Sequence, residues 1–339
     1  MPETSYATRP TFAPRELVGT AIAGLGVEVP EEIVSNQVVA DRLGVKPEWI
    51  TERTGVERRH VLPPGRTLVD LATGAGRAAI IDARIDPVEI DLVIVATVTG
   101  EMLCPAAAPM VAARLGCELA GAFDLNAACS GFLSGVAMAS SWVANGNARN
   151  ALVVGADLMY RLIDHDDRGT AGIFADGGGA VVITSCHGAG RIGPVKLASD
   201  GDRGGLVEAT REEAIIRMNG HDTFRQAVAR LCETTTGTLE AARFGLDDVD
   251  LFVYHQANSR IIAAVGEKLG LDPDRVVDCV HEYGNTSAGS IPIALGAARE
   301  DGRLRAGSKV LLSAFGGGLT WGAGLVEWGT PEGGEDEQV

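Results

Sequence analysis

Residues 174–183 read FADGGGAVVI, and residues 315–326 read FGGGLTWGAGLV. In each stretch a phenylalanine and a glycine run precede an apolar segment, and the two phenylalanines lie 141 residues apart. A pattern that recurs at such a distance indicates two similar halves of one chain. We therefore predict halves at residues 1–185 and 186–339, with a boundary at which a functional site could be shared.

Short apolar runs alternate with longer segments of helical period on both sides of this boundary. We predict strands at 92–98, 122–126, 151–155, 180–184, 250–254 and 309–313. We predict helices at 109–115, 131–144, 224–244, 260–269 and 289–299. Alternating strands and helices are typical of an α/β fold whose sheets are covered on both faces.

The composition restricts the classes of partner. The chain has 339 residues, of which 46% are hydrophobic, so it is long enough to bury a large core. It carries 29 basic and 45 acidic residues, a net charge of −16 that argues against a broad surface for nucleic acid or anionic membrane. Only four of the basic residues are lysines. Arginine, the dominant basic residue, binds phosphate in a fork and stacks on planar rings.

The six cysteines include no C-x-x-C pair, and we expect neither disulfides nor a metal site. The N-terminus lacks the basic-then-apolar pattern of a signal peptide, and no apolar run is long enough to span a bilayer. We therefore expect a soluble, cytoplasmic protein. Residues 1–16 are predicted to be a loose arm, and the glycine-rich acidic segment from about 329 a flexible tail.

Cys129 is the first candidate for chemistry. It follows the predicted strand 122–126 and precedes the helix 131–144, a junction at which ligands bind in α/β sheets. A helix N-terminus lowers the pKa of a thiol and favours the nucleophilic thiolate. Most unpaired cysteines are instead small buried core residues, and position alone leaves both interpretations open.

Two further strand or loop ends carry polar residues. His255 ends the strand 250–254, and Asn285 precedes the helix 289–299. A histidine or asparagine at such a place is often structural, the asparagine as a helix cap. Alternatively, both could assist Cys129 by donating to a developing negative charge. The run Gly316–Gly318 could turn backbone N–H groups toward one point, or could simply form a hairpin.

Together these motifs resemble the 3-oxoacyl-[acyl-carrier-protein] synthase III family of condensing enzymes, over about residues 17–328. The resemblance rests on NAACSGF around Cys129, HQANSRI from His255, GNTSA around Asn285 and FGGGLTWG from Phe315, with further matches at EWI (48–50), RTG (53–55), DRGT (167–170) and FADGGG (174–179). It implies a thiolase-like, five-layered α-β-α-β-α fold of two similar halves. It also implies a homodimer with a Cys-His-Asn site.

The family's chemistry has two half-reactions. The resemblance implies that Cys129 takes the acyl group from acyl-CoA, with the backbone N–H groups of Cys129 and Gly317 as the oxyanion hole. Malonyl-acyl-carrier protein then loses CO₂ while His255 and Asn285 donate to the enolate oxygen. Acyl-CoA is a substrate in this scheme, and no cofactor is expected.

The resemblance also assigns the binding residues. Trp49 and Arg168 would sandwich the CoA adenine, Arg53 would bind its phosphates and Asn258 its pantetheine. The docking of the acidic carrier protein would involve Arg225, Arg260 and Lys268. One position that is basic in the family is Glu267 here, which puts the affinity for the carrier protein in question.

Cys104 matches the position at which a neighbouring subunit closes the acyl pocket, often with a bulky residue. Because cysteine is small, we hypothesise a pocket that admits branched or longer starters. Two alternatives stay open. One is a specialised relative that selects or transfers starter groups in a polyketide or secondary-metabolite pathway. The other is a non-catalytic partner that binds acyl carriers, although the complete Cys-His-Asn set argues against it.

Overall fold

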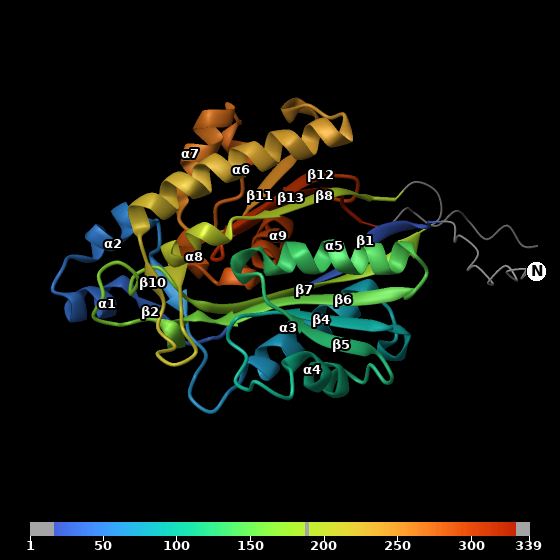
Figure 1. Ribbon diagram of the computed structural model, residues 1–339, viewed down its shortest axis with the longest axis horizontal. Helices are drawn as coiled ribbons and strands as arrows, with labels where there is room; N and C mark the ends of the chain where they lie inside the picture. The colour runs from blue at the N-terminus through green and yellow to red at the C-terminus, as the bar shows by residue number, and fades with distance from the viewer. Residues whose placement is uncertain (1–16, 187–189, 330–339) are drawn as a thin grey trace, which may run out of the picture.

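The computed structural model describes residues 17–186 and 190–329. The predicted arm at 1–16 and nearly all of the predicted acidic tail lie outside these residues. The described chain forms five layers in which helices and sheets alternate, with two sheets enclosing a central pair of helices (Figure 1). The predicted α-β-α-β-α architecture is therefore confirmed.

The first sheet has the strand order β1-β7-β6-β4-β5. Its strands are β1 (Gly19–Glu28), β4 (Leu92–Ala96), β5 (Gly121–Leu125), β6 (Asn150–Leu158) and β7 (Asp176–Cys186). The neighbours of β4 run parallel to it, whereas β7 runs antiparallel to both β6 and β1. The carboxyl ends of β4, β5 and β6 therefore lie at one edge of the sheet.

The second sheet has the order β11-β12-β13-β8. It consists of β8 (Ile192–Ser199), β11 (Leu251–Tyr254), β12 (Lys309–Gly316) and β13 (Thr320–Glu327). As in the first sheet, the first strand of the half pairs antiparallel with the last, and the last pairs antiparallel with the strand before it. The two halves thus share a topology, while the boundary between residues 185 and 186 stays a prediction.

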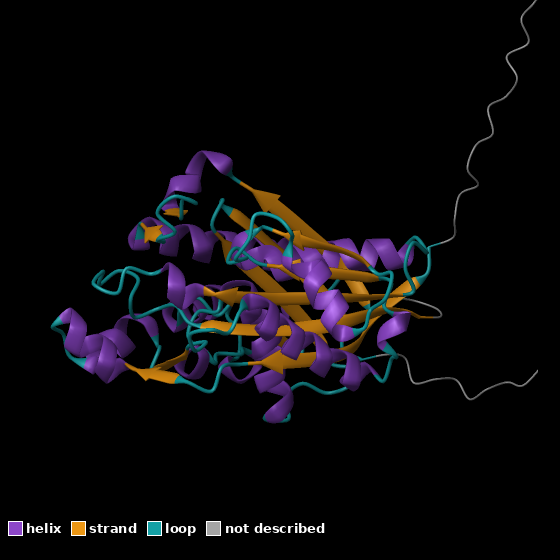
Figure 2. Cartoon of the chain, turned by 90° about the horizontal axis from the view of Figure 1, so that it is seen from below, coloured by secondary structure: helices purple, strands orange, loops and turns teal. Residues whose placement is uncertain are grey.

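Three helical layers cover the four faces of these sheets. The central layer is α5 (Gly131–Ala144) and α9 (Ser290–Glu300), and its apolar side chains join those of both sheets in one core. The outer layers are α3 (Leu68–Ala83) with α4 (Ala107–Leu115), and α6 (Gly220–Ala242) with α7 (Ser259–Leu269). A view at right angles shows the strands at the centre with helices around and between them (Figure 2).

The two glycine runs that indicated the repeat differ in structure. Gly177–Gly179 lies inside β7, which begins at Asp176 rather than at the predicted residue 180. A Cβ on Gly179 would come within 2.7 Å of Pro292, so the missing side chain lets α9 pack directly on the strand. The second run forms the hairpin turn after β12, where Gly318 has a φ of +127° that requires glycine.

Shorter elements stand beside the strand ends that carry the site. They are β2 (Ile33–Ser35), α1 (Asn36–Leu43), α2 (Pro47–Thr54), β3 (Arg58–His60), β9 (Val207–Glu208), β10 (Arg217–Met218) and α8 (Val280–Tyr283). Short 3-10 turns cover Pro87–Glu89, Ala128–Ser130, Met159–Leu162, Gly201–Leu206, Leu246–Asp248, Pro273–Arg275 and Ser287–Gly289. Within residues 17–186 and 190–329, no helix has the length and apolar character that would let it cross a membrane.

Candidate active site

A single cavity of about 630 Å³ brings most of the predicted site residues together. Of these residues its walls include Trp49, Arg53, Cys129, Arg168, Arg225, His255, Asn258, Arg260, Asn285 and Gly317. Lys268, exposed in the last turn of α7, and Cys104, exposed before α4, lie outside this lining. The two halves of the chain therefore contribute to one cavity.

Cys129 lies on a sharp bend between β5 and α5. Ala128, the first residue of the 3-10 turn Ala128–Ser130, has a φ of +46°, a left-handed conformation that is unfavourable for alanine. Ser130 Oγ donates to Thr320 Oγ1 over 2.9 Å, and Thr320 Oγ1 donates to Ala127 O over 3.0 Å. These bonds fix the bend against β13 of the other half.

The environment of the Cys129 thiol differs from the prediction. Burial raises its pKa to about 12, and the nearby Asp157 carboxyl raises it further, while Ser287 and the N–H of Cys129 oppose the rise. A raised pKa runs against the prediction that the helix N-terminus favours the thiolate in the free protein. Its largest cause is the loss of bulk water, which disfavours the charged form.

His255 is buried at the end of β11, with 3% of its surface exposed. Burial lowers its pKa to about 3, so the imidazole is neutral at physiological pH. Its Nδ1 lies 2.6 Å from Ser290 Oγ, which also accepts the Gln256 N–H over 3.4 Å. An arrangement in which the Ser290 hydroxyl donates to Nδ1 satisfies these groups and leaves Nε2–H as a donor.

Asn285 is held between both halves. Its backbone exchanges hydrogen bonds with the segment around Phe174: Asn285 N–H donates to Ile173 O, and Ala175 N–H donates to Asn285 O, each over 3.0 Å. Its side-chain Oδ1 accepts the Ser287 N–H over 2.9 Å. This bond commits Oδ1 to the turn, so Nδ2 is the end that can donate to a ligand.

The glycine hairpin approaches the nucleophile closely. A Cβ on Gly316 would lie 2.7 Å from Cys129 N, so only glycine lets the hairpin reach that backbone amide. Gly317 follows at the turn and lines the cavity. The run therefore forms a hairpin turn that stands beside the N–H of Cys129. Convergence of its own N–H groups on one point stays a prediction.

The predicted CoA residues gather around the cavity at α2 and near α1. The Arg53 guanidinium lies over the Trp49 ring, 4.3 Å from its centroid. The Arg168 guanidinium donates from Nε and Nη2 to Leu43 O, over 3.3 and 3.0 Å. In the described chain, therefore, Arg53 occupies a face of Trp49 on which an adenine could stack.

Asn258 caps α7 and ties it to α2. Its Oδ1 accepts the Arg260 N–H over 2.8 Å, and its Nδ2 donates to Arg53 O over 3.0 Å. Arg260 and Arg225 are exposed at the cavity, with Arg225 Nη1 3.9 Å from Asp222 Oδ1. Such exposed pairs are weak, so the cavity keeps a positive rim on a strongly acidic protein.

The structure adds residues that the sequence did not single out. Asp157, the second-last residue of β6, is fully buried. Ser287 lies near Cys129, and Ser290 contacts His255. The signal for Asp157 was a lone acidic residue in the apolar run 151–158. The apolar wall is formed by Ile173, Phe174, Val207, Met218, Phe224, Leu231 and Phe315, which come from separate segments.

Comparison with known proteins identifies similar families. Residues 123–201 match the family model 3-oxoacyl-[acyl-carrier-protein (ACP)] synthase III, and residues 239–328 match the model of its C terminal. Beta-ketoacyl-[acyl-carrier-protein] synthase III 2 of Streptomyces coelicolor is 43% identical over 322 residues, which cover 94% of this chain and 97% of the relative. The synthase III of Staphylococcus aureus strain Newman is 39% identical over 312 residues, covering 92% and 100%.

Solved structures show the same similarity. The 3-oxoacyl-(acyl carrier protein) synthase III of Pseudomonas aeruginosa PAO1 superposes with a TM-score of 0.88 at 39% identity, covering 93% of this chain and 100% of that one. The priming beta-ketosynthase from the R1128 polyketide biosynthetic pathway superposes with a TM-score of 0.91 at 32% identity, covering 95% and 100%.

Proposed function

The chain belongs to the 3-oxoacyl-[acyl-carrier-protein] synthase III family, and we propose that it condenses an acyl-CoA starter with malonyl-acyl-carrier protein to initiate fatty-acid synthesis in the cytoplasm. The observation that carries this proposal is the single cavity shared by Cys129, His255 and Asn285. A nucleophile, two hydrogen-bond donors and an apolar wall are what a decarboxylating acyl transfer needs.

In the first half-reaction, the Cys129 sulfur attacks the thioester carbon of acyl-CoA. The thiol gives up its proton, the carbon–sulfur bond to CoA breaks, and CoA leaves with a proton as a thiol. The tetrahedral oxyanion is stabilised by the N–H groups of Cys129 and Gly317. Because the thiol pKa is raised to about 12, the thiolate forms only as the reaction proceeds.

In the second half-reaction, the malonyl carbon–carbon bond breaks and CO₂ leaves, which places the electron pair on an enolate. Nε2–H of the neutral His255 and the Asn285 Nδ2 donate to the enolate oxygen. The enolate carbon attacks the acyl-enzyme carbonyl, the carbon–sulfur bond breaks, and the Cys129 thiolate that departs takes up a proton from solvent. Two preorganised donors in a cavity from which bulk water is largely excluded stabilise this charge better than water does.

Substrate binding uses the arginines of the rim. Arg53 would bind the CoA phosphates once an adenine displaces it from Trp49, and Arg168 would cover the second face of the adenine after leaving Leu43 O. Asn258 retains a second Nδ2 hydrogen for the pantetheine. Arg225 and Arg260, with Lys268 farther along α7, would receive the acidic carrier protein. The scheme requires no cofactor, because acyl-CoA enters it as a substrate.

We further propose that the enzyme is a homodimer. Within residues 17–186 and 190–329, β5 is an edge strand with no further strand paired to it. Met102 and Leu103, next to Cys104 in the segment between β4 and α4, are 48% and 82% exposed. Apolar side chains left in water favour an interface. A second copy would cover them, and its Cys104 would close a deep acyl pocket.

A second candidate is the priming of a polyketide pathway. The observation that favours it is the similarity to the priming beta-ketosynthase of the R1128 pathway, which has a TM-score of 0.91. The two candidates share the Cys129 chemistry and differ in the starter and in the carrier protein. Condensation assayed with carrier proteins from the two kinds of pathway would separate them.

The purified protein is incubated with acetyl-, isobutyryl-, butyryl- and hexanoyl-CoA, and the acylated residue is located by mass spectrometry before malonyl-acyl-carrier protein is added. We expect an adduct on Cys129 and then a 3-oxoacyl product. No adduct with any thioester would refute the proposal, and an adduct without condensation would favour starter transfer. A clear preference for acetyl-CoA would contradict the deep pocket.

A further inference from the structure

The turn that carries Asn285 is docked on the first half of the chain. The Ala288 N–H donates to Asp157 Oδ2 over 3.2 Å, and the Ser287 N–H donates to Asn285 Oδ1 over 2.9 Å. Gly155 of β6 makes this approach possible, because a Cβ there would lie 2.3 Å from Ala288 O. The turn Ser287–Gly289 therefore sits directly on β6, beside the bend that presents Cys129.

Ser287 combines two unfavourable features at this place. Its φ is +51°, and its side chain is 1% exposed. The hydroxyl lies near enough to the Cys129 thiol and the Asp157 carboxyl to lower the pKa of both. Nevertheless, Oγ makes no well-formed hydrogen bond within the described part of the chain. Strain and an unpartnered buried hydroxyl that coincide beside a nucleophile indicate a role in the reaction.

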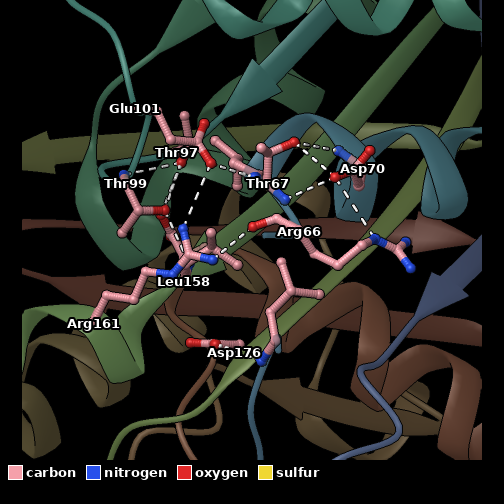
Figure 3. Close-up of polar contacts among 12 residues, drawn as sticks. Arg66, Thr67, Asp70, Thr97, Thr99, Glu101, Leu158, Arg161 and Asp176 are labelled. Carbon is pink, nitrogen blue, oxygen red and sulfur yellow. Dashed lines mark hydrogen bonds and ion pairs between the residues drawn. The ribbon is translucent and has the colours of Figure 1, made fainter. Parts of the chain in front are cut away.

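The Asp157 carboxyl binds the turn and is itself held by hydrogen bonds. Its Oδ1 accepts the Thr97 and Thr99 hydroxyls, each over 2.9 Å, and the Val98 N–H over 2.8 Å. Thr99 Oγ1 also accepts the Leu158 N–H over 2.9 Å, as Figure 3 shows beside Glu101 and Arg161. Oδ1 therefore accepts three donors, while Oδ2 accepts the Ala288 N–H that holds the turn.

We propose that Ser287 is a further catalytic residue, whose hydroxyl donates a hydrogen bond to the Cys129 sulfur whenever that sulfur carries negative charge. Asp157 is the positioning residue that holds the turn. The inference rests on the proposed acyl-Cys129 chemistry. It explains why a buried hydroxyl without a well-formed hydrogen bond is kept in a strained conformation, since the charged sulfur accepts its proton more strongly than the neutral thiol does.

The sulfur is negative twice in the cycle: when it attacks the thioester and when it leaves the acyl-enzyme. Ser287 keeps its own proton in both steps, so no bond to oxygen forms or breaks. The thiol proton still goes to the departing CoA, as above. A hydroxyl that donates to a thiolate lowers the free energy of that species more than that of the neutral thiol.

The test measures alkylation of Cys129 by iodoacetamide from pH 6 to 10, quantified by mass spectrometry of the Cys129 peptide in the full protein. This readout requires no acyl-CoA, so it separates the present inference from the proposed function.

The titratable groups around the sulfur are His255, which shares the cavity, and Asp157 on β6; Asp176 on β7 lies behind Asp157. His255 is neutral throughout this pH range, because burial lowers its pKa to about 3.

Ser287→Ala should slow alkylation at pH 8 by about threefold to tenfold, because it removes the donor to the thiolate. Ser287→Gly should do the same, although glycine suits the φ of +51° and relieves the strain. Asp157→Asn should accelerate alkylation by a similar factor, because it removes a neighbouring negative charge. A purely structural defect would shift all three variants in the same direction.

Thr73→Val is the matched control, since it removes another buried, unpartnered hydroxyl in α3, and its alkylation rate should equal that of the parent. Parental or faster alkylation of both Ser287 variants would overturn the proposal. Slower alkylation of Asp157→Asn would also overturn it, because a displaced turn would then explain the slower alkylation of all three variants. If Asp157→Asn does not fold, the two Ser287 variants still decide the question.

Discussion

Ala128 and Ser287 are the residues at which the backbone is bent most tightly around the site. Their φ angles are +46° and +51°, and each is the first residue of a 3-10 turn that leads into a central helix, α5 or α9. Non-glycine residues persist in this region only when their surroundings hold them there. The two halves thus use the same local construction to present Cys129 and the Asn285 turn to one cavity.

At Asn285, donation to substrate can be separated from support of the turn. Asn285→Asp keeps an oxygen for the Ser287 N–H but loses the Nδ2 donor, whereas Asn285→Ala loses both. Each should slow condensation by about 10²–10³-fold and leave acylation of Cys129 nearly unchanged. Asn285→Ala should also lower the free energy of unfolding by about 1–2 kcal/mol, because the Ser287 N–H loses its acceptor.

Single-turnover assays of each half-reaction, together with urea unfolding, would check this expectation. If Asn285→Asp condensed at the parental rate, Asn285 would be a turn residue and not an enolate donor.

At the scale of elements, glycines on the strands set how closely the helices pack. Gly179 of β7 faces Pro292 of α9, and Gly322 and Gly324 of β13 face Leu133 of α5. In each half, therefore, glycines of the last strand pack against a central helix. The two glycine runs of the sequence are not equivalent, because one lies in strand β7 and the other at a hairpin turn. Close packing of the central layer brings the two helix starts, and hence the site residues, together.

The outer helix α3 packs on β1 in the same way, which allows a stability test far from the cavity. A Cβ on Gly26 would lie 2.2 Å from Ala75 O, so Gly26→Ala should push α3 away and cost about 1–3 kcal/mol of unfolding free energy. Gly266→Ala, inside α7 with no atom within 4 Å of the new Cβ, should stabilise by about 0.5–1 kcal/mol. If the two substitutions changed the free energy of unfolding equally in urea, the close packing of α3 on β1 would not be what requires glycine at position 26.

At the scale of the whole molecule, charge is distributed unevenly. The chain has a net charge of −16, yet Arg53, Arg168, Arg225 and Arg260 line one cavity. The anionic substrates therefore meet local positive charge on an acidic protein. Electrostatic attraction of this kind acts mostly on association and weakens as salt screens it.

Reversing one rim charge should affect the two substrates unequally. Arg260→Glu should lower kcat/KM for the carrier-protein substrate by about tenfold at low salt and change acylation by CoA less than about threefold. The defect should shrink at about 0.5 M salt. Arg149→Glu makes the same change of charge at the other end of β6 from Asp157 and should leave both half-reactions unaltered. Equal losses in both half-reactions of Arg260→Glu would contradict separate docking of the carrier protein.

The sequence by itself determined the layered α/β fold, the strands with continuous apolar runs and the residues proposed for the chemistry. Local patterns suffice for the strands and the strand-to-helix junctions, which are encoded within about ten residues. The five layers and the roles of the site residues followed instead from the resemblance of the ordered motifs to a known family. Only the tertiary structure decided that Ser287 and Asp157 face Cys129, that Arg53 covers Trp49, and that burial raises the pKa of Cys129 to about 12. Desolvation and contacts across the two halves depend on residues far apart in the chain, so a local pattern cannot predict them.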